Sequence, residues 1–306
     1  TAGTITDLEY YNTKIFQSEF ITLRRPFNRR PDPSQPAQTP PPFQIQFTSI
    51  GGPVVNLYRA PVDNDARGRG RASGTTQLWN LKGEVAGFSV QKLNDKTAEV
   101  KIDLKSTEPG GYSIASSSTY TIYGNGTVDV NTTFTPDEAT WSLPKLGFIF
   151  SLNPGFEEVE YFGAGPYESY VDRKRASYIG RYTTTVDNMF VPYVRTQDCG
   201  NRTDVRWFTL TNHAGTGMMV SAPDLMNFSA LHYSPVDLDK ANHAFELTRR
   251  DETILTVDLA GCGLGNGSCG PPPMDRYLLK ATKAIFKYTI KPYTSLLGDK
   301  SAIAAE

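Results

Sequence analysis

Short β-type segments dominate the chain from residue 43 onward, and they limit the folds that are open to it. Segments such as "AEVKIDLKS", "TVDVNTTFTP" and "ETILTVDLA" are rich in β-branched and aromatic residues, and several alternate apolar with polar side chains. Turn residues separate them at close intervals, for example "GNG" at 124–126 and "AGTG" at 214–217. Because no long helical segment lies between them, we expect antiparallel sheets that stack or close on themselves.

Only one segment has convincing helix signals. In "SPVDLDKANHAFEL", Ser234 fits an N-cap, Pro235 fits the first helical position, and Asp237 follows the cap by three residues. The sequence therefore predicts an all-β fold with at most one or two short helices.

The first 42 residues differ from the rest. Residues 24–42, "RRPFNRRPDPSQPAQTPPP", contain many prolines, which prevent regular strand pairing and stiffen the chain. We interpret residues 1–42 as an N-terminal extension with a proline-rich strap, and residues 43–306 as one β domain. The strap is expected to be a surface loop, with a proline-rich ligand for another protein as the alternative.

Charge and apolar patterning restrict the partners. The chain has 31 basic and 32 acidic residues, so neither nucleic acid nor a membrane surface is an expected partner. The longest apolar runs are only as long as strands. The chain opens "TAGTITDLEYYN", with no Met and no hydrophobic signal segment, and we interpret it as a mature or excised piece of a larger protein.

Five Asn-X-Ser/Thr sequons favour an extracellular protein, with the cytoplasm as the alternative. These candidate glycosylation sites are Asn125, Asn131, Asn201, Asn227 and Asn266.

The three cysteines are too few for a disulfide scaffold and lack zinc-site spacing. Cys262 and Cys269 close a glycine-rich loop, so we predict that they are bridged or closely apposed, with Asn266 and Ser268 facing solvent or a ligand. We predict neither a metal nor a cofactor.

The densest part of the chain is "YFGAGPYESYVDRKRASYIGRY", residues 161–182. Glu168 and Asp172 are four residues apart, as a glycosidase pair on a helix would be. The glycines and proline just upstream favour a loop, and Arg173 with the two cations after it would keep both carboxylates ionised. We therefore expect a charge network that organises a docking loop, to which tyrosines such as Tyr170 add contact area.

A second charged motif, "RAPVDND", covers residues 59–65. Arg59 can build a buried turn with Asp63, Asn64 and Asp65 in which the polar groups satisfy one another. Metal binding by the two aspartates is the alternative.

His232, in "FSALHYSP", is the best histidine candidate for sugar chemistry, because it precedes the helix start. Sugar mutarotation uses a histidine acid and a carboxylate base. A packed, hydrogen-bonded histidine is the alternative, and whether the chain is an enzyme remains open at this point.

These motifs carry a resemblance to a known family. In order, they are "YRAPVDND" (58–65), residues 161–182, "GNRTDVRWFTL" (200–210), "FSALHYSPVDLDKA" and "GCGLGNGSCGPP". In order and wording they resemble the C-terminal domain, or small chain, of family 2 β-galactosidases, over roughly residues 43–295.

The resemblance implies a galactose-mutarotase-like β supersandwich that packs beside a TIM barrel. In this family the barrel carries both catalytic glutamates, and no barrel precedes this chain, so we expect no hydrolysis by the chain alone. The resemblance also implies that the loop matching "GLGNGSCGPP" contributes to the substrate pocket, where Cys269 stands in place of the Trp of some members. The candidate sugar contacts are Asn266, Ser268, Cys269 and His232.

Three functions remain open. The first is a β-galactosidase module that supports sugar binding and assembly, with a galactoside-type carbohydrate and a large β-galactosidase chain or a second copy as partners. The second is a free-standing, lectin-like sugar-binding protein. The third is a mutarotase or epimerase.

Overall fold

The structure is a computed structural model that describes residues 7–10, 13–17, 20–21, 49–67, 75–137, 142–265 and 273–305. The proline-rich strap predicted at 24–42 lies outside these residues. None of the helices in the described part is long and apolar enough to cross a bilayer.

Fifteen strands form most of the described chain. In chain order they are β1 (Asp7–Tyr10), β2 (Thr13–Gln17), β3 (Phe20–Ile21), β4 (Ser49–Asn56), β5 (Lys82–Asn94), β6 (Thr97–Thr107), β7 (Ser113–Tyr123), β8 (Val128–Pro136), β9 (Lys145–Leu152), β10 (Glu158–Gly165), β11 (Tyr178–Thr185), β12 (Arg202–Thr211), β13 (Thr216–Leu231), β14 (Thr253–Gly261) and β15 (Ala284–Thr294). All of their pairings are antiparallel, which confirms the predicted all-β antiparallel class.

The helices are short. They are α1 (Asp63–Arg67), α2 (Val186–Met189), α3 (Pro235–Lys240) and α4 (Lys300–Ala305), with the 3-10 turns η2 (Thr75–Asn80), η3 (Ala244–Glu246), η4 (Asp275–Tyr277) and η5 (Ser295–Leu297). The prediction of one or two helices was therefore too low, since the described residues hold four α-helices of at most six residues.

The helix predicted from Ser234 is present as α3. The Ser234 side chain accepts a hydrogen bond from the backbone of Asp237, and the Asp237 side chain accepts one from the backbone of Ser234. This capping box explains why the helix begins at Pro235. The helix ends at Lys240, and the rest of the predicted segment contains only the turn η3.

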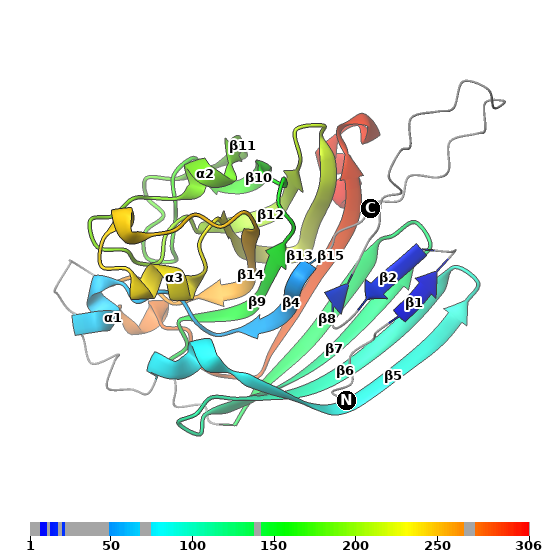
Figure 1. Cartoon of the computed structure of the whole chain (residues 1–306), viewed down its shortest axis with the longest axis horizontal. Coiled ribbons are helices and arrows are strands. Elements are labelled where there is room, and N and C mark those ends of the chain that lie inside the picture. The colour runs from blue at the N-terminus through cyan, green and yellow to red at the C-terminus, as the bar shows by residue number, and fades with distance from the viewer. Residues whose placement is uncertain are drawn as a thin grey trace.

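The long strand β13 joins two branches of one twelve-stranded sheet. On one side it pairs with β12, followed by β10 and β11. On the other side its first half pairs with β15, which continues through β8, β7, β6 and β5, while its second half pairs with β14, which continues to β9 and β4. Figure 1 shows β5–β8 as a row of long strands on one side of the molecule, with α1, α2 and α3 gathered at the opposite end.

The strands that continue from β14 pack face to face on the strands that continue from β15, and aromatic side chains form the contact. The buried ring of Phe148, on β9, lies 5.6 Å from that of Phe134 on β8 and 6.0 Å from that of Tyr288 on β15. Beside them, Phe208 of β12 stacks on Phe228 of β13 with 4.2 Å between ring centroids. Alternating apolar residues supply this layer: along β7 and β8, every second side chain is buried.

Candidate functional site

The charged motifs and the glycine-rich loop meet around a single pocket of about 520 Å³. Its lining residues are Val62, Asp63, Asn64, Asp172, Arg173, Tyr193, Gln197, Asp198, Leu264 and Gly265. Since the lining contains three carboxylates and one guanidinium, the pocket is polar and its net charge is negative. The structure therefore brings together the motifs 59–65 and 161–182, which are about a hundred residues apart in sequence.

Arg59 ties the first motif to the glycine-rich loop beneath this pocket. Its guanidinium binds the Asp65 carboxylate at 3.0 and 3.1 Å and also donates to the carbonyls of Cys262, at 2.7 Å, and Gly263, at 2.9 Å. The side chain is only 2% exposed. Burial is the largest single effect and opposes its charge, but the combined attraction of Asp65, Cys262 and Asp198 raises the pKa of Arg59 above its usual value. Arg59 therefore pairs with Asp65 within the predicted turn, while Asn64 binds the glycine-rich loop instead, and the docking role of this motif remains a prediction.

Two further side chains hold the same loop. Asn64 donates its amide to the carbonyl of Leu264 at 2.9 Å, and the Asp172 carboxylate accepts from the backbone N–H groups of Leu264 at 3.0 Å and Gly265 at 2.8 Å. A Cβ atom at Gly263 would lie 2.6 Å from Asp172, and Gly265 has a φ of +91°, so both positions require glycine. The loop edge at 262–265 is therefore clamped from two sides.

Glu168 has its own partners and does not act with Asp172 as a pair. The nearly buried Glu168 carboxylate binds the guanidinium of Arg173 at 3.0 Å, the hydroxyl of Tyr193 and the backbone N–H of Gly200 at 2.9 Å. Asp172 instead faces the glycine-rich loop. With each carboxylate occupied by separate donors, the arrangement favours a loop-organising charge network over a glycosidase pair.

Tyr170 lies between these two acids in sequence and closes the turn. Its carbonyl accepts the backbone N–H of Arg173 at 2.8 Å, while its ring is buried. Burial raises the pKa of the Tyr170 hydroxyl well above its usual value, and the buried ring packs inside the domain.

A buried ion cluster underlies the pocket. The ammonium of Lys145, at the start of β9, lies 3.4 Å from the carboxylate of Asp198 and 3.7 Å from that of Asp258 on β14, and all three side chains are at most 5% exposed. Burial, with help from Asp198, raises the pKa of Asp258 to about 6, against the opposing effect of Lys145. In the described part of the chain, the second carboxylate oxygen of Asp198 has no hydrogen-bond partner. One charge of this cluster thus lies at the pocket wall.

Our sequence interpretation missed this cluster. A signal was available, because Lys145 opens the apolar run "KLGFIFSL" and Asp258 interrupts the buried run "TILTVDLA". An isolated charge in a strand that is buried on both faces requires a partner, although the sequence does not show which one.

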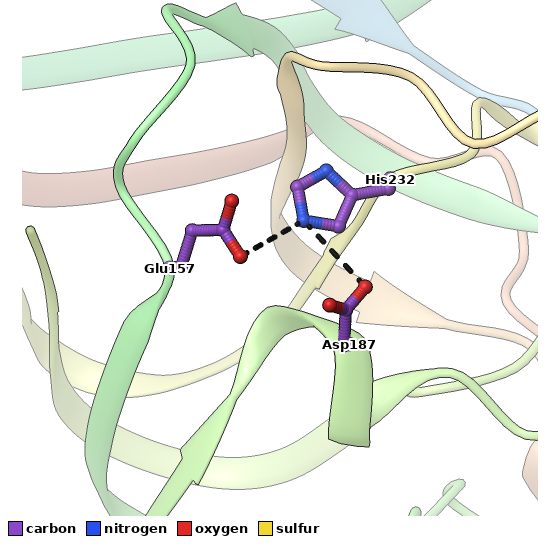
Figure 2. A group of neighbouring side chains, drawn as sticks. All are labelled: Glu157, Asp187 and His232. Atoms are coloured by element: carbon purple, nitrogen blue, oxygen red, sulfur yellow. Dashed lines mark ion pairs between the residues drawn. The ribbon is translucent and has the colours of Figure 1, made fainter.

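His232 lies in a different cluster, shown in Figure 2. Its ring is 1% exposed, and Nδ1 donates to the carbonyl of Glu252 at 3.0 Å. Nε2 faces the carboxylates of Glu157, at 3.5 Å, and Asp187, at 3.8 Å, and accepts a hydrogen bond of 2.8 Å from Arg249. A donor at Nδ1 and an acceptor at Nε2 together define the neutral tautomer.

The predicted sugar-contact residues are therefore not gathered in one site by the described residues. His232 is not part of the pocket lining, and its nearly complete burial keeps its ring from any sugar in solution. Asn266, Ser268 and Cys269 lie outside the described residues, so their sugar contacts remain predictions. Cys262 is a buried, free cysteine, which contradicts the predicted Cys262–Cys269 bridge, while the close apposition of the two residues remains a prediction.

The sequons differ in exposure. Asn201 is 3% exposed and its amide donates to the carbonyl of Ser169 at 2.7 Å, so it is unavailable as a glycan acceptor in the folded chain. An Asn-X-Thr triplet does not reveal whether its asparagine is buried, and glycosylation at the sequons remains a prediction. Asn125 and Asn131 are exposed and Asn227 is half-buried.

Comparison with known proteins gives consistent results. Residues 44–291 match the family model described as the β-galactosidase small chain. The β-galactosidase of Lactobacillus delbrueckii subsp. bulgaricus is 34% identical over 264 residues, covering 79% of this chain and 25% of that protein. The β-galactosidase of Priestia megaterium is 30% identical over 243 residues, covering 78% and 23%. This chain thus spans about a quarter of the length of the curated relatives that it matches.

Among solved structures, a putative aldose 1-epimerase from Escherichia coli K12 matches with a TM-score of 0.35 and 10% identity, covering 68% of this chain and 69% of that one. No function is transferred from a similarity of that size. The family match spans most of the chain and includes every motif that surrounds the pocket. The chain therefore belongs to the β-galactosidase small-chain family.

Proposed function

We propose that this chain is the small-chain part of a β-galactosidase, and that the pocket at residues 62–65, 172–173, 193–198 and 264–265 lies on the face that meets the rest of that enzyme. The observation that carries the proposal is the pocket itself. Family motifs form much of its wall, yet two of its acids, Asp172 and Asp198, are held by structural partners. Such a pre-organised, negatively charged surface is suited to recognising a partner and not to breaking a glycosidic bond alone.

Exposed aromatic side chains on the same motif support this role. Tyr167 and Tyr178, from the motif 161–182, are 68% and 74% exposed although they flank a well-packed loop. Tyrosine is enriched at the centres of protein interfaces, because its ring supplies contact area and its hydroxyl a hydrogen bond. Two exposed tyrosines on a rigid loop therefore fit a docking surface.

The test compares charge reversal inside and outside the pocket. Asp63→Lys places a cation at the pocket wall, while Asp224→Lys reverses an exposed carboxylate on β13 and serves as the matched control. In the whole enzyme, or in this chain mixed with its large chain, we expect Asp63→Lys to lower nitrophenyl galactoside hydrolysis or co-elution at least tenfold and the control to leave both unchanged. Hydrolysis by the isolated chain, or equal behaviour of the two variants, would contradict the proposal.

One observation favours the free-standing sugar-binding function as a second candidate. Trp79, in η2, is 48% exposed, and an exposed indole is a common stacking surface for a sugar ring. Titration of the isolated chain with galactose, followed by tryptophan fluorescence, tests it against Trp79→Ala. Saturable quenching that disappears in the variant supports sugar binding, and an unchanged signal removes this candidate.

A further inference from the structure

A three-ligand cluster forms around His232, away from the pocket. The three ligand residues are Glu157 just before β10, Asp187 in α2 and His232 just after β13. Arg249, in the loop before β14, lies beside them, so four separate segments of the chain meet here. The ligand atoms of the two carboxylates and the imidazole all lie within 4.8 Å of one another. Figure 2 shows both carboxylates directed at the same ring nitrogen.

The spacing of these atoms is close to that of a metal site. Four-coordinate Zn²⁺ with bonds of about 2.1 Å separates neighbouring ligand atoms by about 3.4 Å. Here His232 Nε2 lies 3.5 Å from Glu157 Oε2 and 3.8 Å from Asp187 Oδ1. Both distances from Nε2 are therefore within a few tenths of an ångström of that spacing, and all three ligand atoms lie within 4.8 Å of one another.

The orientation of the histidine points the same way. Nδ1–H of His232 donates to the carbonyl of Glu252, which leaves the lone pair of Nε2 directed at the carboxylates. Metal-binding histidines are held in this manner, with the second ring nitrogen bound to a carbonyl or carboxylate. Since the ring is 1% exposed, the backbone and not the solvent fixes its direction.

A cation already occupies the centre of the cluster. The single nitrogen Nη2 of Arg249 lies 2.8 Å from His232 Nε2, 3.2 Å from Glu157 Oε2 and 3.3 Å from Asp187 Oδ2. The guanidinium is thus a stand-in for a metal ion, because it contacts the ring nitrogen and both carboxylates, with Nε of Arg249 reaching Oδ1 of Asp187 at 3.0 Å. It is also able to leave, because the Arg249 side chain is 40% exposed and that of Asp187 58%.

We propose that Glu157, Asp187 and His232 form a binding site for a late first-row divalent cation of the Zn²⁺ class, and that Arg249 competes with the metal for it. Binding displaces the guanidinium into water and replaces one positive charge by two between two carboxylates. A mixed set of one imidazole nitrogen and two carboxylate oxygens suits Zn²⁺, whereas Mg²⁺ and Ca²⁺ prefer oxygen ligands alone. The bound ion joins the three segments that carry Glu157, Asp187 and His232, which Arg249 holds together in its absence.

Competition with a chromophoric chelator measures Zn²⁺ affinity for the purified chain and its variants. Arg249→Ala removes the competing cation and should tighten binding of one Zn²⁺ at least tenfold, while Mg²⁺ stays weak. Asp187→Asn, a change at an exposed side chain, should weaken Zn²⁺ binding at least tenfold in the wild-type and in the Arg249→Ala background. Zn²⁺ should also raise the melting temperature of every variant that binds it.

His243 provides the matched control. It is another histidine beside a carboxylate, 2.9 Å from Glu246, but within the described residues it forms an ion pair with that one carboxylate alone. His243→Ala should leave Zn²⁺ affinity unchanged. The proposal is wrong if His243→Ala removes the binding, if Asp187→Asn has no effect, or if Arg249→Ala binds no tighter than wild type. Should Arg249→Ala fail to fold, the comparison of wild type with Asp187→Asn decides alone.

Discussion

Replacing Asp258 by asparagine tests whether the buried ion cluster makes the stability of this protein depend on pH. The Asp258 carboxyl is fully buried, and its pKa is about 6 in the folded chain against 3.8 for an ordinary aspartate. The folded protein therefore binds this proton more tightly than the unfolded chain does. The stability that the protonated carboxyl contributes is complete below about pH 4 and is lost as the pH rises through about 6.

The magnitude follows from the difference between the two pKa values. About two pH units at 1.36 kcal/mol each correspond to about 3 kcal/mol. Asp258→Asn abolishes this titration, so the unfolding free energy of the variant minus that of wild type should rise by about 3 kcal/mol between pH 4 and pH 7. Urea unfolding at half-unit intervals of pH, followed by tryptophan fluorescence, measures it.

The control is Asp224→Asn, which removes an exposed carboxylate from β13. Its unfolding free energy should follow that of wild type throughout the range. If the Asp258→Asn difference is flat with pH, the carboxyl of Asp258 does not have a raised pKa and the linkage argument fails.

The remaining predictions concern stability at neutral pH, each measured as the change in urea midpoint. Lys145→Met leaves two buried carboxylates without their cation and should cost about 3–5 kcal/mol, so a loss below about 1 kcal/mol would show that water reaches the cluster. Ser234→Ala removes the N-cap of α3 and should cost about 1 kcal/mol, with helix-proximal amides exchanging faster. Phe208→Ala removes a fully buried, stacked ring and should cost about 3–5 kcal/mol, whereas Phe245→Ala, at an 85% exposed position, should stay within about 0.5 kcal/mol; equal effects would contradict the packing described here.

Local patterns were sufficient for many elements of this fold. Alternation in "TVDVNTTFTP" corresponds to β8, and the apolar run "ETILTVDLA" to β14. The helix start at Ser234 follows from three side chains that act within one turn. These signals depend on neighbours in sequence, and therefore a single sequence contains them.

The sequence did not reveal the full length of β13. Pro223 and Asp224 are residues that strands disfavour, yet the observed strand continues through both of them to Leu231. The exposed residues at 223–225 interrupt an otherwise largely buried strand at the point where it exchanges β15 for β14 as its neighbour. Which strands pair is decided by packing across the whole domain, and no local pattern records it.

The candidate site also combines local contacts, which could be predicted from the sequence, with long-range contacts, which could not. The ion pair between Arg59 and Asp65, six residues apart, could be predicted, but the bonds from Arg59 to the carbonyls of residues 262 and 263 could not. The proposed metal cluster likewise combines residues from 157 to 249, none of which forms a local motif. In a sequence, the residues of a long-range polar contact are seen only as isolated charges, and the sequence does not show which residues pair with them.

During synthesis of the chain, the pocket cannot be completed until the glycine-rich edge at 262–265 has been made. A ribosome releases the chain from its N-terminus, and residues 62–65 and 172–198 emerge long before this edge does. Until it arrives, Arg59, Asn64 and Asp172 lack the backbone groups to which they bind in the finished domain. The surface is therefore completed by nearly the last part of the domain to be synthesised. A nascent or truncated chain that ends before residue 262 therefore presents no finished pocket. An intact pocket shows that the chain extends at least as far as this edge.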